Sequence, residues 1–340
     1  MNNYEKKLRD LKGKTVAVVY IFEGEDAAGF EHYHVWKSKI ISRWLNAIED
    51  IACKPFIIDV RTFVFKAMNN TLPKIDFVLN LNCGSKMLSS MSLVPSVCSF
   101  LSVPCIPCNA NTILMGENKK ASNMIAIANN LNVPKSIDEP NENAIFRPLN
   151  LGSSVGVRKG ARNNISNDEL YQEFISGYDA TFPIMYNPIK SDLDFLPGVL
   201  YLPNNNDPNW FFGENEKVIN NDFQNFPIYN IDDLSKKMMK NFAKSFPIET
   251  FCRIDVRIKT SEEKLSKSIC EKTISFKDIF FVEINPMPTV KDGNAFDLSF
   301  NYINENNDFN RCLDIHRNVF ESTNINTFLL TSSMIALTNY

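Results

Sequence analysis

Strand-like and helical segments alternate along the first hundred residues, and this alternation is what most constrains the fold. Short segments rich in β-branched and other apolar residues lie at 14–20, 55–60 and 76–82, and apolar residues at helical spacing lie between the first two, at 35–50. Strands separated by helices pair in parallel, because the crossover returns the chain in the same direction. We therefore expect an α/β domain that ends near residue 110.

Beyond residue 110 the pattern mixes helices with strands. Helical periodicity predicts helices at 118–132 and 232–246, and β-type segments predict strands at 144–150, 250–258 and 279–285. A stretch rich in Asn, Pro and aromatic residues covers 203–230. Because irregular segments of that length usually have a function, we expect this one to order as a lid over a binding site.

Composition narrows the classes of function. The 340 residues are 44% hydrophobic and 22% charged, which is typical of a globular protein of two or three domains. The formal net charge of −3 argues against nucleic acid as a partner, since neutralising phosphates requires clustered Lys and Arg. The sequence contains no apolar run of the roughly 18 residues that a membrane helix needs, and its charged start lacks the apolar region of a secretory signal. We expect a cytoplasmic protein without a membrane partner.

Two groups of residues resemble metal sites but are better explained otherwise. Cys105 and Cys108 form a CxxC pair without a second CxxC or a nearby histidine. We predict buried, reduced thiols there, with a redox or zinc role as the alternative. Glu31, His32 and His34 also lack further ligands, so a surface or packing role is expected for the two histidines.

Two C-terminal segments carry polar residues at alternate positions. In CRIDVRI (252–258), Arg253, Asp255 and Arg257 share one face of the predicted strand, and in FVEINP Glu283 and Asn285 do the same. If the two strands pair as a hairpin, two carboxylates and an amide oxygen converge, which is the donor set that holds Mg²⁺. The alternative is a solvated hairpin face with balanced charges.

A second motif follows the predicted strand at 144–150. The sequence Asn150-Leu-Gly-Ser-Ser-Val-Gly156 places small residues and hydroxyl groups where backbone N–H groups can approach a polyphosphate. It lacks the endings of the Walker A and dinucleotide-binding motifs. Taken alone, such a motif is more often a Gly-rich hairpin turn than a phosphate-binding loop.

Together and in this order, the motifs resemble the ATP-grasp superfamily and, within it, the D-alanine–D-alanine ligase branch. The matching segments are FRPLNLGSSVGVRKG (146–160), QEFISGYDATF (172–182), CRIDVRI (252–258) and VEINPMP (282–288), with a weaker match over 76–122. Residues 183–249 and 291–330 fit poorly. The resemblance implies a three-domain ATP-grasp fold of α/β and α+β units, with ATP between the central and C-terminal domains. We place the domains at 1–110, 111–185 and 186–340.

The resemblance also assigns roles to residues at matching positions. Asp255, Glu283 and Asn285 take the metal-ligand positions, for two Mg²⁺ ions that Mn²⁺ can replace. Arg253 takes the position of the arginine that stabilises the tetrahedral transition state, where a fixed cation meets developing negative charge. The residues implied to bind ATP are Lys119 (or Lys120) and Arg147 at the phosphates, Ser153 and Ser154 in the covering loop, Gln172, Glu173 and Ile175 at adenine, and Asp179 at the ribose.

The sequence departs from that branch mainly on the substrate side. Arg147 stands where a second phosphate lysine is usual. Thr289 replaces the glycine near the second substrate, and Asn82 begins a segment that replaces a His-Gly followed by acidic residues. The tyrosine- and lysine-containing lid is absent, and Lys217 is the candidate to substitute for its lysine. Glu31 is the candidate for the glutamate that binds the first substrate's ammonium group, with Glu23 and Glu25 as alternatives.

The nucleotide and metal features are retained whereas the substrate features differ. The resemblance therefore implies an ADP-forming carboxylate–amine ligase that works through an acyl-phosphate, specialised for a dipeptide or other peptide product. The alternatives are a divergent D-alanine–D-alanine ligase of cell-wall synthesis and an ATP-binding module that has lost turnover. The implied partners are small amino acids or peptides and a second copy of the chain in a homodimer.

Overall fold

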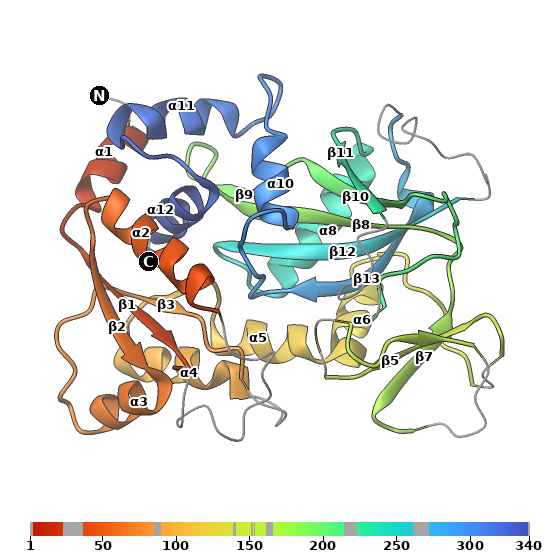
Figure 1. Cartoon of the computed structure of the whole chain (residues 1–340), viewed down its shortest axis with the longest axis horizontal. Coiled ribbons are helices and arrows are strands. Elements are labelled where there is room, and N and C mark those ends of the chain that lie inside the picture. The colour runs from red at the N-terminus through yellow and green to blue at the C-terminus, as the bar shows by residue number, and fades with distance from the viewer. Residues whose placement is uncertain are drawn as a thin grey trace.

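The computed structural model describes residues 3–22, 37–84, 90–138, 141–150, 152, 154–160, 166–213, 223–260 and 272–338. Its β-structure falls into three sheets, with helices between and beside them (Figure 1). In the described part of the chain, no helix is long and apolar enough to cross a membrane.

The first sheet is parallel, as the strand–helix alternation predicted. Its strand order is β2-β1-β3-β4, formed by Lys54–Asp59, Thr15–Tyr20, Phe77–Asn80 and Cys105–Ile106. The helices of this part are α1 (Asn3–Asp10), α2 (Ser38–Asp50), α3 (Val60–Met68) and α4 (Leu93–Leu101), the last preceded by a 3₁₀ turn at Ser90–Ser92. Trp44 on α2 is buried, as expected for a core residue of a helix with that periodicity.

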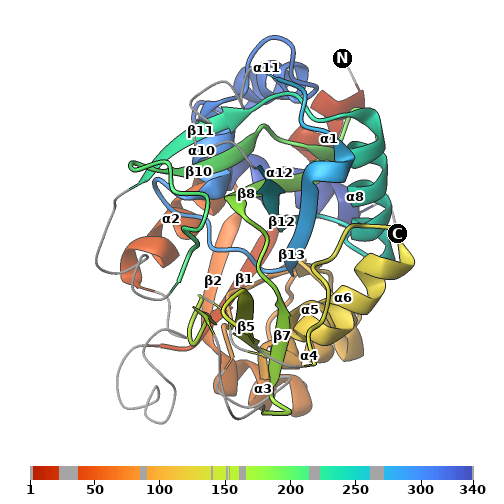
Figure 2. The same cartoon turned by 90° about the vertical axis from the view of Figure 1, so that its right-hand side faces the viewer.

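Two helices lead from the first sheet to a small antiparallel sheet. They are α5 (Ala110–Glu117) and α6 (Lys119–Ala128), and the small sheet has the order β6-β5-β7, formed by Arg158–Lys159, Ala144–Pro148 and Glu169–Glu173. Figures 1 and 2 both show this small sheet below the large one.

The large sheet is antiparallel and carries the C-terminal motif. Its order is β11-β10-β8-β12-β13, with β9 also paired to β8. The strands are β8 (Gly177–Asn187), β9 (Asp192–Phe195), β10 (Gly198–Pro203), β11 (Phe223–Ile228), β12 (Phe251–Lys259) and β13 (Ile279–Asn285). The remaining helical segments are α8 (Asp233–Ser245), the 3₁₀ turn Phe276–Asp278, α10 (Ala295–Asn301), α11 (Asn310–Val319) and α12 (Ile325–Leu337).

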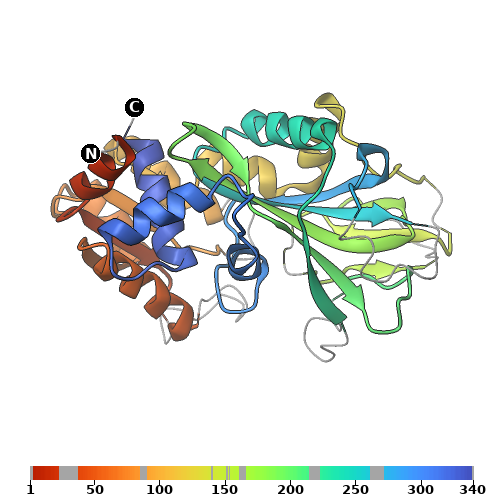
Figure 3. The ribbon, with the colours of Figure 1, turned by 90° about the horizontal axis from the view of Figure 1, so that it is seen from above.

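The C-terminal helices return to the first part of the chain. α12 packs against α2, and α11 packs against α1, so the chain's two ends share one core (Figure 3). Residues 325–336 of α12 are all buried, because the helix is enclosed by α2, β8 and α10. Because the helix is enclosed on all sides, it has no exposed polar face, and polar residues such as Asn326 and Thr331 are buried in it too.

Two expectations are refined by the structure. The stretch 203–230 is not irregular throughout, because 223–228 form β11 against β10, and residues 214–222 lie outside the described part. The predicted boundary near residue 110 coincides with the start of α5, whereas the one at 185 falls inside β8. The division into three domains remains a prediction.

Candidate active site

The predicted hairpin is present and brings the polar residues of both strands together. β12 pairs with β13 antiparallel, so that Arg253 lies opposite Asn285 and Asp255 lies opposite Glu283. β12 is also paired to β8 on its other side, which makes it an interior strand of the sheet. Its polar face lines a cavity of about 340 Å³ and is not an open, solvated hairpin face.

Three hydrogen bonds hold the carboxylates close together. The Asn285 amide donates from Nδ2 to Asp255 Oδ2 at 2.9 Å and to Glu283 Oε1 at 3.3 Å. The Thr181 hydroxyl donates to Asp255 Oδ1 at 2.6 Å. Two carboxylates beside an amide are a donor set that fits Mg²⁺, provided the Asn285 amide is turned to present its oxygen.

Burial and neighbouring charges set the protonation preferences of this group. Burial raises the pKa of Asp255, and the Glu283 carboxylate acts in the same direction, while Arg253 opposes them. Burial alone would lower the pKa of Arg253, but the adjoining Asp255 outweighs it and the pKa is raised. Arg253 is therefore a permanent cation at the edge of the carboxylate pair.

The residues predicted at the phosphates line the same cavity. Asn118 caps α6 by accepting a hydrogen bond from the Ala121 N–H, which places Lys119 at the first helical position. Lys119 is 5% exposed and its Nζ lies 3.8 Å from Glu283 Oε2, whereas Lys120 is exposed and does not line the cavity. The structure thus places Lys119, and not its neighbour, at the site.

Arg147 on β5 lines the same cavity as Lys119. It is buried, donates to the Val282 carbonyl at 2.7 Å and contacts Gln172 Oε1. Burial lowers its pKa, and Glu283 and Asp179 partly offset that effect. Ser154 also lines the cavity.

The residues predicted at adenine and ribose lie on β7, β8 and the segment between them. Gln172, Glu173, Ile175 and Asp179 all line the cavity. The Gln172 amide also donates to the Pro134 carbonyl at 2.8 Å, and Glu173 Oε1 accepts from the Lys135 N–H at 3.0 Å. These bonds tie the strand to the loop that follows α6.

Arg257 also lines this site, although no role was predicted for it. Its Nη1 lies 3.0 Å from Asp179 Oδ1, and Nη2 donates to the carbonyls of Gly177, Pro208 and Trp210 at 2.7–2.9 Å. The guanidinium also lies over the Phe174 ring, 4.5 Å from its centroid. Asp179 additionally accepts from the Phe212 N–H at 2.9 Å. Arg257 therefore joins the ribose end of the site to the segment 208–212.

An aromatic wall was likewise missed from the sequence. Tyr201, Phe212 and Phe223 line the cavity and pack edge to face, with ring centroids 4.7 Å apart for Tyr201–Phe212 and 5.0 Å apart for Phe212–Phe223. Trp210 packs on Phe212 at 4.8 Å. Asn225 lies opposite Tyr201 across β10 and β11, and its buried Oδ1 has no hydrogen-bond donor among the residues that the structure describes. The sequence feature that could have indicated this wall is the group of aromatic residues in 203–230, the stretch predicted to form a lid.

The residues predicted on the substrate side and in the covering loop lie partly outside the described part of the chain. Glu31, Ser153 and Lys217 lie outside the described residues. Thr289 is not among the residues that line the cavity, and its carbonyl accepts from the Asn294 amide. The same loop contributes Lys291, Gly293 and Asn294 to the lining.

The cysteines of the CxxC pair are free. Cys108 is buried and its thiol donates to the Pro286 carbonyl at 3.1 Å; Cys105 is half-buried on β4. A hydrogen bond with Cys98, followed by burial, raises the pKa of Cys105, and burial raises that of Cys108. Thiols in this state are poor nucleophiles, as expected for buried, reduced cysteines.

Comparisons with known proteins identify the fold. No protein-family model and no curated protein matches the sequence. Among solved structures, the chain is similar to the D-alanine–D-alanine ligase of Bacillus anthracis in complex with ATP, with a TM-score of 0.63 and 13% identity over 97% of this chain and 100% of the other. It is also similar to the VanG D-Ala:D-Ser ligase of Enterococcus faecalis (TM-score 0.60, 12% identity, 96% and 100%) and to the D-alanyl-alanine synthetase A of Vibrio cholerae (TM-score 0.59, 12% identity, 92% and 100%). The chain has the ATP-grasp fold of the D-alanine–D-alanine ligases.

Proposed function

We propose that this protein is an ATP-dependent, ADP-forming ligase that joins a carboxylate to an amine through an acyl-phosphate. The observation that carries this proposal is that Arg253, Asp255 and Glu283 line one cavity together with Lys119 and Arg147, while Asn285 bonds both carboxylates. The fold supports it, because the neighbours named above are ligases and one of them was solved with ATP.

The nucleotide occupies the end of the cavity between the small and large sheets. Adenine lies against β7 and Ile175, and the ribose hydroxyls bond to Asp179, whose carboxylate is held by Arg257 and the Phe212 N–H. Lys119 and Arg147 both line the cavity and contribute positive charge to the phosphates. Arg147 keeps its contacts with Val282 and Gln172, so it acts as a fixed cation.

Asp255, Glu283 and Asn285 would hold Mg²⁺, and the ion would supply positive charge against the phosphates of the nucleotide. The substrate carboxylate is phosphorylated at this point, and the amine then attacks the acyl carbon and displaces phosphate. Arg253 lies beside the carboxylate pair and stabilises the negative charge that develops on the tetrahedral intermediate. The residues of the cavity need no covalent nucleophile for this sequence of steps.

The substrates are amino acids or a short peptide, and the wall of the site favours a specialised ligase. Tyr201, Phe212 and Phe223 supply a broad apolar surface, and Lys291 supplies a cation at the rim that has no ion-pair partner among the described residues. Such a wall accommodates a larger side chain than a methyl group.

The test is phosphate release from Mg-ATP with single D- and L-amino acids and all their pairs. Hydroxylamine added to each single amino acid traps an acyl-phosphate as the hydroxamate, even where the natural amine is missing. We expect pair-dependent phosphate release and an equimolar dipeptide, and loss of both in Asp255→Asn and Glu283→Gln.

The outcomes separate the alternatives. Turnover with D-alanine alone would identify a D-alanine–D-alanine ligase. Binding of ATP without phosphate release or hydroxamate for any amino acid or dipeptide would support a non-catalytic module. Full turnover in either carboxylate variant would refute the assignment of the metal ligands.

A further inference from the structure

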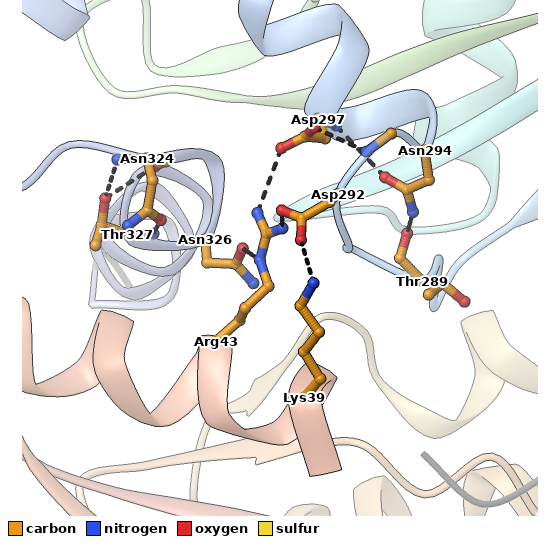
Figure 4. Close-up of polar contacts among 10 residues, drawn as sticks. Lys39, Arg43, Thr289, Asp292, Asn294, Asp297, Asn324, Asn326 and Thr327 are labelled. Carbon is orange, nitrogen blue, oxygen red and sulfur yellow. Dashed lines mark hydrogen bonds and ion pairs between the residues drawn. The ribbon is translucent and has the colours of Figure 1, made fainter. Parts of the chain in front are cut away.

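Arg43 on α2 connects the first part of the chain to the loop that follows β13. Its guanidinium contacts the Asp292 carboxylate, lies 3.3 Å from Asp297 Oδ1 through Nη2, and donates from Nε to Asn326 Oδ1 at 3.2 Å (Figure 4). The three partners come from the loop, from α10 and from α12. The side chains of Arg43 and Asp297 are only 20% and 21% exposed, so this pair is more shielded than an ordinary surface ion pair.

The loop that Arg43 holds is part of the cavity wall. It leaves β13 at Asn285, beside Arg253, and contributes Lys291 and Gly293 to the lining. Asp292 lies between those two residues in sequence and bonds outward to Arg43 and Lys39. Fixing Asp292 from outside therefore restricts which way its two neighbours face.

The same network of contacts also fixes the position where the loop ends and α10 begins. The Gly293 N–H donates to Asp297 Oδ2 at 2.9 Å, and Asn294 caps α10 by accepting from the Asp297 N–H. Because Arg43 binds the other oxygen of Asp297, one carboxylate joins α2 to the backbone of the cavity wall.

We propose that Arg43 is a positioning residue that holds the loop 289–294 as the substrate end of the active site. This inference rests on the proposed ligase function, since it assigns the loop to the substrate and not to the nucleotide. Arg43 is suited to the task because its planar fork serves three acceptors in fixed directions. Arg43 is not among the residues that line the cavity, so it can influence substrate binding only through the loop.

Lys39 provides a matched control. It lies one turn before Arg43 on α2 and pairs with the same Asp292, 3.0 Å away, but its side chain is 81% exposed. An exposed pair of this kind contributes little to stability. Lys39→Met thus removes a cation from the same network without removing the bonds to Asp297 and Asn326.

The first measurement is steady-state kinetics with the amino-acid pair that gives the highest turnover in the array above. For Arg43→Met we expect KM for the amino acids to rise about tenfold or more while KM for ATP and kcat change less than about threefold. Arg43→Lys should recover part of the loss, and Lys39→Met should match the unmodified protein. Equal rises in the KM values for ATP and amino acids, or no rise, would refute the positioning role.

The second measurement does not require an active substrate. Hydrogen–deuterium exchange on the full chain should show faster exchange of the peptide covering 289–298 in Arg43→Met, and unchanged exchange there in Lys39→Met. Asp297→Asn is the second variant if Arg43→Met folds poorly. Unchanged exchange in this peptide would overturn the inference even if the ligase is confirmed, and faster exchange in a protein inactive on the whole array would refute the ligase alone.

Discussion

Arg253 forms a bidentate pair with Asp255, from Nε to Oδ1 at 2.7 Å and from Nη2 to Oδ2 at 2.8 Å. The residue proposed to stabilise the transition state thus binds the residue proposed to hold the metal. A cation that faces both oxygens of Asp255 competes with Mg²⁺ for the same lone pairs. Arg253 would therefore have to release or share Asp255 before these oxygens could hold a metal ion.

Arg253→Met should therefore separate metal binding from catalysis. We expect phosphate release to fall at least about a hundredfold, since a fixed donor to the developing charge is lost. The affinity for Mg²⁺ with a non-hydrolysable ATP analogue should stay equal or rise, because a competing cation has been removed. Calorimetric titration of Mg²⁺ into the protein–analogue mixture checks this, and a weaker affinity in the variant would contradict it.

Arg257→Met should weaken the nucleotide site without touching the metal ligands. The side chain holds Asp179 and three backbone carbonyls, so its loss frees both the ribose contact and the segment 208–212. We expect ATP affinity to fall about tenfold, and Arg257→Lys to restore little, because an ammonium group cannot serve these acceptors in one plane.

Lys159→Met is the control for that variant. Lys159 lies over the same Phe174 ring, 3.9 Å from its centroid, but makes none of the Asp179 or carbonyl contacts. Its loss should change ATP affinity by less than about threefold. Calorimetric titration with ATP measures the affinity of both variants. Equal losses of affinity would show that the contact with the Phe174 ring, and not the contacts with the carbonyl groups, supports nucleotide binding.

The strand pairing that brings Asp255 and Glu283 together was predictable because its signal is local, whereas the fold as a whole was predicted from the order of motifs along the chain. Alternation over CRIDVRI and FVEINP fixes which residues share a face, and only one pairing places Asp255 beside Glu283. The Asn118 cap decides between two adjacent lysines once the start of the helix is known. Such features depend on a few neighbouring residues.

The rest of the site depends on contacts between distant segments. Arg43 contacts Asp297 across a separation of 254 residues, and Arg257 contacts Trp210 across 47 residues that include β11 and α8. β11 escaped prediction because its residues are only partly buried and mix polar with apolar side chains without clear alternation. The spacing of residues along one sequence does not predict such contacts between distant segments.

Gly177 is expected to tolerate no side chain. Its φ is +151°, and an added Cβ would lie 1.9 Å from the Ile258 carbonyl oxygen, where β8 meets β12. Gly177→Ala should lower the free energy of unfolding by about 3 kcal/mol or more, since backbone must move in an interior strand pair. Gly152→Ala is the control: no atom of the described residues lies within 4 Å of its Cβ position, so its unfolding free energy should change by less than about 0.5 kcal/mol. Urea unfolding measures the stability of both variants. A Gly177→Ala protein as stable as the unmodified one would contradict the prediction of a clash with Ile258.

His316 should make the protein less stable in mild acid. It is fully buried on α11 between the rings of Phe320 and Phe328, with Nδ1 2.9 Å from Thr323 Oγ1. Burial lowers its pKa from 6.5 to about 4, with the nearby Arg317 acting in the same direction. Between those two values the unfolded chain binds a proton that the folded chain does not, so stability falls as the pH drops through 6.5 towards 4.

The size of the effect follows from that shift in pKa. The contribution of His316 should be about 2 kcal/mol less favourable at pH 5 than at pH 7. His316→Asn keeps a polar atom near Thr323 but cannot titrate, so it should be less stable than the unmodified protein at pH 7 and yet lose about 2 kcal/mol less on acidification. Urea unfolding at the two pH values measures both differences. An identical loss in the variant and the unmodified protein would mean that His316 is not the group whose protonation destabilises the fold, because every other titrating residue is common to the two chains.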